Sequence, residues 1–197
     1  MKKLVLATGN RNKAAEIKAL LADLDLEVRT LKDYPEIRMP PEDRPDFAGN
    51  AVKKAEAVAA YTGLPAMADD SGLEVDALEG RPGVRSARYA GEDSSDRDNN
   101  QLLLKELAGL PPERRSARFR CAVAVSVPGK RTEVVEGVCP GRIAEKPDGS
   151  GGFGYDPVFI YEPEGLTFAR MSPEAKNRVS HRGIALGKAR RLLKKLL

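Results

Sequence analysis

The chain has 197 residues, of which 41% are hydrophobic and 31% are charged, and its formal net charge is +4. This balance is typical of a globular protein with a sizeable core, and no apolar run is long enough to span a bilayer. Two cysteines without CxxC spacing and a single histidine exclude a disulfide framework and a histidine-rich metal centre. We therefore expect one domain, residues 1–197, in the cytoplasm, with Cys121 and Cys139 as small buried residues.

Hydrophobic periodicity predicts alternating strands and helices in the first half of the chain. Ile17, Leu20 and Leu21 recur at helical spacing, and Gly63 stands where a helix commonly ends. The expected elements are a strand at 3–7, a turn at 8–10, a helix from about residue 13, a strand at 26–31, a loop at 34–46 and a helix at 47–62.

The second half of the chain adds a hairpin. Residues 117–127 alternate apolar and polar, and the turn at 128–130 leads into another strand-like run at 132–138. Strands of both kinds mixed with helices predict an α/β fold with a mixed sheet. The other expected elements are an irregular segment at 79–99, a short helix at 99–108, an extended segment at 156–161, a helix opened by Ser172-Pro173 and a C-terminal helix capped by Ser180.

The most informative segment is acidic: Asp69 and Asp70 stand between apolar residues, and Ser71-Gly72 follow them. Adjacent carboxylates repel, so a fold that keeps them together commonly uses them for a divalent cation or a proton transfer. We expect a turn at a strand end, where the small Ser-Gly pair lets a ligand approach the backbone. Glu42 can add a third carboxylate. The alternative is a solvated Asp-rich turn.

The segment Thr8–Lys13 joins a strand to a helix N-terminus. Such a junction offers backbone N–H groups and a favourable dipole to an anion, and Lys13 adds positive charge. Lys54, near the start of the alanine-rich helix, can also reach a phosphate. The segment lacks the spacing of a P-loop, and the alternative is an ordinary polar turn with an asparagine capping the helix.

A second glycine-rich loop, residues 149–156, contains Phe153, Tyr155 and Asp156. Aromatic side chains among glycines suit stacking on a planar base, with Asp156 available to the base edge. No helix follows the loop, so a dinucleotide fold is not expected. The alternative is a hairpin loop whose aromatic rings pack on the core.

The C-terminal segment is basic. Residues 170–197 hold nine Lys and Arg against the single acid Glu174, whereas the rest of the chain is net acidic. This asymmetry indicates a phosphate-rich partner, either a nucleotide or a nucleic acid, unless the charges are a solvated helix face. Near a helix junction in this segment, His181 and Arg182 are candidate ligand contacts, although an isolated histidine is more often structural.

Taken together, these segments resemble the inosine/xanthosine triphosphate pyrophosphatase family of nucleotide hydrolases. The matching motifs run nearly from end to end in the family order, which is far more specific than any one of them. They are TGNxxK at 8–13, FxxNAxxKA at 47–55, ADDSGL at 68–73, PGVRSARYAGE at 82–92, GGFGYDPVF at 151–159 and SHRG at 180–183. One departure lies before Asn50, where Gly49 replaces an acid often found in the family.

The resemblance implies a Mg²⁺-dependent enzyme, using one or more ions, that hydrolyses non-standard purine nucleoside triphosphates such as ITP, dITP and XTP. The products would be the monophosphate and pyrophosphate, which prevents incorporation of these nucleotides into DNA and RNA. It also implies a long mixed central sheet flanked by helices, two lobes with an active-site cleft between them, and a homodimer. A membrane or a stable nucleic-acid partner is not expected.

The resemblance also implies roles for individual residues. Asp70 would be the catalytic acid/base residue and a metal ligand, with Asp69 and Glu42 supporting the cation, and Ser71 would touch the substrate. The implied triphosphate ligands are Thr8, Gly9, Asn10, Arg11, Asn12, Lys13, Lys54 and Arg88. The implied base and ribose ligands are Phe153, Gly154, Tyr155, Asp156, Lys176, His181 and Arg182.

Two competing interpretations remain open. A nucleic-acid-binding protein would use the basic C-terminal segment, but it would need exposed aromatics among the basic residues or a recognisable module, and neither is present. An enzyme of the same class could instead act on standard or pyrimidine triphosphates.

Overall fold

The computed structural model describes residues 2–197, and they form two compact units. The first unit contains the chain up to Asp70, Cys121–Gly137 and Gly183–Leu197, and the second contains Ser71–Arg120 and Val138–Arg182. The division falls within strands and at a helix start, so single elements contribute residues to both units.

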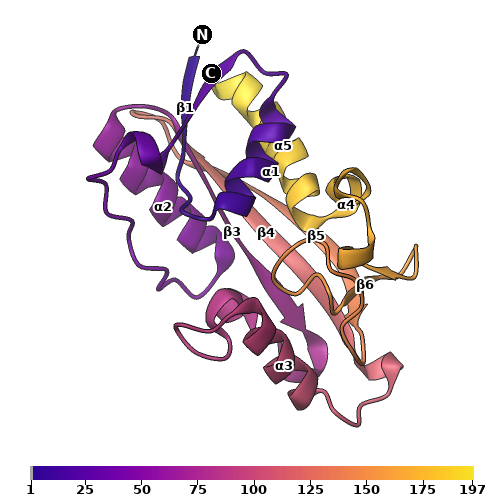
Figure 1. Cartoon of the computed structure of the whole chain (residues 1–197). Coiled ribbons are helices and arrows are strands. Elements are labelled where there is room, and N and C mark those ends of the chain that lie inside the picture. Colours follow the sequence, from indigo (N-terminus) through magenta and orange to yellow (C-terminus); the bar gives the residue numbers. More distant parts are fainter. Residues whose placement is uncertain (1) are drawn as a thin grey trace. The chain divides into compact units, whose positions relative to one another are not determined.

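Strands and α-helices alternate along the chain as far as the fourth strand, after which three more strands and then two helices follow (Figure 1). The α-helices are α1 (Arg11–Leu21), α2 (Phe47–Thr62), α3 (Asp96–Glu106), α4 (Pro173–Val179) and α5 (His181–Leu196). The strands are β1 (Lys2–Leu6), β2 (Leu26–Thr30), β3 (Ala66–Val75), β4 (Ser116–Ser126), β5 (Glu133–Ile143), β6 (Phe159–Tyr161) and β7 (Leu166–Thr167).

The strands form one seven-stranded sheet in the order β2-β1-β3-β4-β5-β6-β7. Strand β1 runs parallel to both β2 and β3, with Val5 opposite Ala66, whereas β6 runs antiparallel to β5 and β7. The sheet is therefore mixed, which confirms the predicted α/β class.

The core of the first unit explains why residues 4–6 of β1 are apolar at every position. Leu4 and Leu6 lie on the face covered by α1 and α5, and Val5 lies on the opposite face, where α2 packs (Figure 1). The buried residues of the first core are Leu4, Leu6, Ile17, Leu21, Met67, Cys121, Val123, Val125, Ala185, Leu186, Ala189 and Leu193.

The second unit has a core of its own, built around aromatic rings. Phe159 packs at 4.6 Å from Phe119 and 4.9 Å from Phe168, measured between ring centroids. Leu103 and Leu107 close this core from α3 and the residue that follows it. Both cysteines are buried and not disulfide-bonded, as predicted.

Most predicted boundaries agree with the structure, and the differences have local causes. Helix α1 begins before Lys13 because the Asn10 side chain accepts hydrogen bonds from the backbone N–H groups of Asn12 and Lys13, at 3.0 and 3.1 Å. Helix α3 also begins earlier than predicted, within the segment 79–99 that was expected to be irregular, because Ser95 and Asp98 form a capping box.

Two strands differ in length from the prediction. The strand after the hairpin turn extends to Ile143, and the extended segment predicted at 156–161 is a strand only from Phe159. Helix α2 spans the predicted residues and ends at Gly63, whose φ of 66° is left-handed. Across residues 2–197, no helix combines the length and the apolarity needed to cross a bilayer.

Candidate active site

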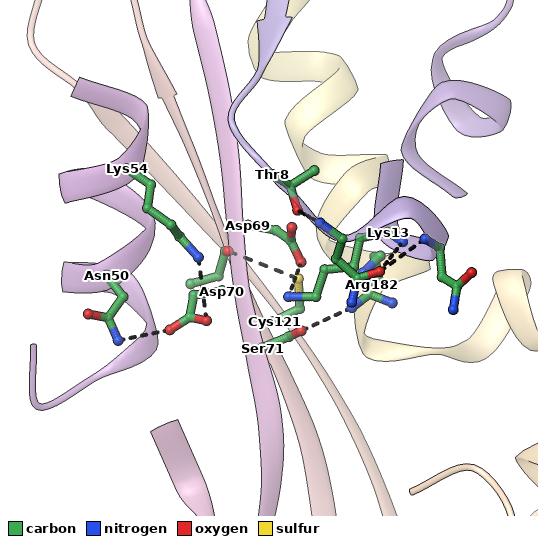
Figure 2. Close-up of polar contacts among 12 residues, drawn as sticks. Thr8, Lys13, Asn50, Lys54, Asp69, Asp70, Ser71, Cys121 and Arg182 are labelled. Atoms are coloured by element: carbon green, nitrogen blue, oxygen red, sulfur yellow. Dashed lines mark hydrogen bonds and ion pairs between the residues drawn. The ribbon is translucent and has the colours of Figure 1, made fainter. Parts of the chain in front are cut away.

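The two adjacent aspartates lie in the middle of a strand, which corrects the predicted turn. Strand β3 continues from Ala66 to Val75 without interruption, and Asp69 and Asp70 are only 1% and 5% exposed. Aspartate is unfavourable in strands, but here each carboxylate has charged or polar partners on a neighbouring helix, which compensates. Because successive side chains of a strand point to opposite faces, the two carboxylates face away from each other (Figure 2).

Asp69 faces α1. Its Oδ2 lies 3.1 Å from the Nζ of Lys13. A contact within the loop before α1 stabilises its conformation, because Thr8 Oγ1 accepts a hydrogen bond from Asn10 N at 3.2 Å. A Cβ atom at Gly9 would meet no heavy atom within 4 Å. Packing within the described residues therefore does not require glycine there, and the backbone is left accessible to a ligand.

Asp70 faces α2. Its Oδ2 accepts a hydrogen bond from Asn50 Nδ2 at 3.0 Å, and its Oδ1 lies 3.6 Å from Lys54 Nζ (Figure 2). Asn50 Oδ1 in turn accepts from Arg44 N at 3.0 Å, which fixes the orientation of the amide. Lys54 is 7% exposed, and its Nζ lies 2.6 Å from Glu42 Oε1. One buried ammonium group is thus shared by two carboxylates.

This environment shifts both titrating groups. Burial raises the pKa of Asp70 above its ordinary value, and the nearby Glu42 adds to the rise, although Lys54 and Asn50 oppose it. Burial alone would lower the pKa of Lys54, but the carboxylates of Asp70 and Glu42 outweigh it and raise the pKa. Asp70 is therefore a stronger base than an exposed aspartate, next to a lysine that stays charged.

The carboxylates do not gather into one large metal cluster. Among residues 2–197, no group of three or more His, Cys, Asp and Glu side chains is arranged to hold a metal ion. Glu42 and Asp70 are associated through Lys54, whereas Asp69 points to the other face of β3. Two hard carboxylates are nevertheless a sufficient protein contribution for Mg²⁺, which usually keeps waters and substrate phosphates as its other ligands.

A second polar group lies in the second unit. The Nη2 of Arg182, at the start of α5, donates to Ser71 Oγ at 3.0 Å. The Lys176 ammonium, from α4, lies 2.5 Å from Asp156 Oδ2 and 5.0 Å from the centre of the Phe153 ring. Arg182 lies over the same ring at 5.5 Å. The predicted base and ribose ligands Phe153, Lys176 and Arg182 are therefore brought together.

Asp156 organises the loop that carries Phe153. It is 2% exposed, and its Oδ2 accepts from Phe153 N at 2.8 Å as well as from Lys176. A Cβ atom at Gly152 would lie only 1.9 Å from the same oxygen, and its φ is 74°, so this position requires glycine. Asp156 thus has an internal structural role in addition to the contact with a base edge that was expected.

Two of the predicted ligands are packed into the core of the second unit. Tyr155 is buried and its hydroxyl donates to Ser86 O at 2.9 Å, and burial raises the pKa of this phenol. The His181 ring stacks on Phe119 with ring centres 4.6 Å apart. For these two side chains the structural alternative considered from the sequence describes the packing well. Arg88 ends a 3₁₀ helix and pairs with Glu92 at 3.5 Å.

Sequence reasoning missed two residues that shape these groups. Asn50 orients Asp70, and its signal was present as the asparagine of the motif at 47–55. Ser86 Oγ accepts from Leu73 N at 2.9 Å and donates to Gly83 O at 2.6 Å, so it anchors the end of β3. A serine among irregular residues carried no comparable signal.

These observations describe an α/β protein with a buried aspartate of raised pKa, lysines that compensate buried carboxylates, and a loop whose phenylalanine ring lies close to two cationic side chains. A sequence model described as the Ham1 family matches residues 4–192. The chain belongs to this family, which confirms the resemblance drawn from the motifs.

Known proteins resemble the chain over almost its whole length. It is 54% identical to the dITP/XTP pyrophosphatase of Geobacillus kaustophilus, covering 95% of this chain and 92% of that protein. A HAM1 protein from Coxiella burnetii superposes with a TM-score of 0.91 at 38% identity, covering 99% of this chain and 100% of the other. A nucleoside-triphosphatase, dITP/XTP pyrophosphatase, from Mycobacterium abscessus superposes with a TM-score of 0.80 at 44% identity, covering 95% and 98%.

Proposed function

We infer that this chain is a nucleoside triphosphate pyrophosphatase that acts on non-canonical purine nucleotides, dITP, ITP and XTP. The observation that carries the inference is the buried Asp70, oriented by Asn50 and lying beside Lys54, in a chain that matches a dITP/XTP pyrophosphatase over 95% of its length. Hydrolysis of such nucleotides to monophosphates would keep them out of DNA and RNA.

We propose that Glu42 and Asp70 hold the Mg²⁺ ion. Their oxygen ligands fit the hard cation, and the Lys54 ammonium between them shows that this position already stabilises positive charge. A bound Mg²⁺ would neutralise phosphate charge and favour loss of a proton from a nearby water. Asp69, expected as a third ligand, instead supports the phosphate-binding loop through Lys13 in this proposal.

The side chains of the first unit would perform the phosphoryl chemistry. An Asp70 carboxylate oxygen takes the proton of a water whose oxygen attacks the α-phosphorus, and the bond from that phosphorus to the bridging oxygen breaks. Pyrophosphate leaves with the bonding electron pair. Lys13 and Lys54, with the N–H groups and side chains of the loop at 8–13, bind the triphosphate and stabilise the charge that develops on the leaving group.

The side chains of the second unit would recognise the nucleoside. The Phe153 ring offers a stacking surface, and Lys176 and Arg182 offer hydrogen-bond donors. Donors directed at a 6-oxo group would meet another donor when adenine presents its 6-amino group, a mismatch that costs about 1–3 kcal/mol when buried. Ser71, Gly154, Tyr155, Asp156 and His181 complete the proposed contacts, and Arg88 is proposed to bind phosphate.

The test is release of pyrophosphate from ITP, dITP, XTP, GTP and ATP, each measured with Mg²⁺ and with EDTA. We expect metal-dependent release that strongly favours ITP, dITP and XTP. Orthophosphate as the product would place the attack at another phosphorus and contradict the mechanism. Equal rates with ATP, GTP or pyrimidine triphosphates would contradict the proposed base recognition.

Three further expectations stay predictions: a homodimer, a location in the cytoplasm, and an active-site cleft between two lobes. The interpretation as a nucleic-acid-binding protein is less favoured, because two basic residues of α5 already pair with other groups of this chain at the surface. Lys188 Nζ donates to Glu136 O at 2.7 Å, and Arg190 pairs with Asp23. A salt-dependent mobility shift with DNA or RNA, together with no turnover of any triphosphate, would restore that interpretation.

A further inference from the structure

Two adjacent lysines of α2 pair with two adjacent acids of the preceding loop, but in different surroundings. Lys53 Nζ lies 2.7 Å from Asp43 Oδ1, and Asp43 is mostly exposed. Lys54 Nζ lies 2.6 Å from Glu42 Oε1 and also 3.6 Å from the buried Asp70. Both pairs tie the same loop to the same helix, so anchoring of the loop does not explain why Lys54 also reaches Asp70.

The ammonium of Lys54 has the properties of a bound cation. It carries one positive charge, it is buried, and it is close to carboxylate oxygens that come from a loop and from β3. Buried carboxylates are costly without a compensating charge. Lys54 supplies that charge to both carboxylates.

An ammonium group and a divalent cation cannot occupy the same space between the same oxygens. An ion that binds Glu42 and Asp70 must therefore displace Lys54 Nζ or be repelled by it. At a separation of about 4 Å, the repulsion between two like charges in a protein is large enough to lower the affinity for the ion by more than tenfold.

The geometry points to Lys54 as an internal placeholder for the metal, which lowers the affinity of the nucleotide-free protein for divalent ions and is displaced when an ion binds. The inference rests on the proposed metal site. Displacement would turn the lysine away from the carboxylates, so that its charge becomes available for the triphosphate. Metal binding and phosphate binding would then favour each other.

The first test measures the affinity of the nucleotide-free protein for Mn²⁺. The concentration of unbound Mn²⁺ is read from its electron paramagnetic resonance signal. We expect Lys54→Met to bind Mn²⁺ at least about tenfold more tightly than the unmodified protein, because the competing charge is gone. Lys53→Met is the matched control: it removes the neighbouring ion pair with Asp43 and should leave the Mn²⁺ affinity unchanged. Equal or weaker binding by Lys54→Met would overturn the inference.

The second test uses only the unmodified protein, so it does not depend on whether a variant folds. The NMR signals of lysine ammonium groups in the unmodified protein are followed during a titration with Mg²⁺. We expect the Lys54 signal to move as the site fills, whereas the Lys53 signal stays in place. Saturation with Mg²⁺ without any change at Lys54 would contradict displacement. Neither test uses a nucleotide, so a negative result here leaves the pyrophosphatase assay unaffected, and the reverse also holds.

Discussion

The two oxygens of Asp70 have different partners, and this asymmetry defines what the side chain can do. Asn50 donates to one oxygen, and Lys54 lies beside the other. Burial nevertheless raises the pKa above the ordinary aspartate value, so the folded protein holds the charged form at a cost. A carboxylate that burial makes more basic is a candidate general base, and a substitution at Asp70 can test this in two ways.

The first prediction is that Asp70→Asn removes turnover. The amide cannot accept the proton of the attacking water, so we expect pyrophosphate release to fall by about 10²–10⁴-fold or more. Far-ultraviolet circular dichroism should remain that of the unmodified protein. Asp25→Asn, an exposed aspartate of the same unit, is the control and should retain activity. If Asp70→Asn kept most of the activity, Asp70 would have no part in the mechanism.

The second prediction is that the same variant is more stable, and increasingly so as pH rises. Because the folded-state pKa of Asp70 is raised, the folded protein binds this proton more tightly than the unfolded chain. Stability is therefore lost as pH rises from the ordinary value of 3.8 through the raised value. We expect the Tm advantage of Asp70→Asn, measured in EDTA, to be larger at neutral pH than in mild acid. A gap that does not depend on pH would contradict this.

Among the secondary-structure elements, helix α2 shows how the motif at 47–55 places two partners of Asp70. Asp46 caps the helix by accepting from Gly49 N at 2.6 Å, and Asn50 and Lys54 then follow at i and i+4 on one face. Their spacing lets both side chains reach the same carboxylate on β3. The loop 149–154 does the equivalent for the second unit, because Asp156 folds it around Phe153.

The close approach of Gly152 to Asp156 in this loop leads us to expect that Gly152→Ala weakens substrate binding. The new methyl group would collide with Asp156 and disturb the positions of Phe153 and Lys176, so we expect KM for ITP to rise by about tenfold or more while Asp70 chemistry is retained. Gly165→Ala is the control: its φ of 66° carries the same backbone penalty, but a Cβ there meets nothing within 4 Å. Equal kinetic effects in both variants would show that backbone strain alone is responsible.

At the scale of the whole molecule, the fold depends on two separate cores and on the polar contacts that close them. In the second unit, the buried Arg115 donates to three backbone carbonyl groups, those of Leu107, Ile143 and Ala144, at 2.7, 2.8 and 2.7 Å. One guanidinium thus joins the segment after α3, the start of β4 and the end of β5. Burial lowers the pKa of this arginine from its ordinary value without removing its charge at neutral pH.

We therefore expect Arg115→Met to destabilise the protein by about 3 kcal/mol or more, because three buried carbonyl oxygens lose their donor. For a chain of this size that corresponds to a fall in Tm of roughly 10 °C, measurable by calorimetry. Arg114→Met, at the exposed neighbouring position, should change Tm by little. A small effect at Arg115 would mean that water satisfies these carbonyl groups.

Local sequence patterns were sufficient to predict most of the helices and strands and to name the family. The helix over 47–62, its end at Gly63 and the alternation in β4 follow from periodicity and backbone preference. Ordered motifs were enough to name the family, and the residues they contain include Asp70, Lys54, Phe153 and Arg182.

The tertiary structure decided where the side chains of those residues lie and which groups they contact. The sequence suggested a turn at Asp69-Asp70, because aspartate and glycine are poor strand formers, and only packing against α1 and α2 shows a strand that sends the carboxylates to opposite faces. Likewise, the family motifs predict Tyr155 and His181 as ligands, and only the tertiary structure shows that both side chains are buried against the core of the second unit. Which face a side chain occupies, and what charge it meets there, depends on long-range contacts that no local pattern encodes.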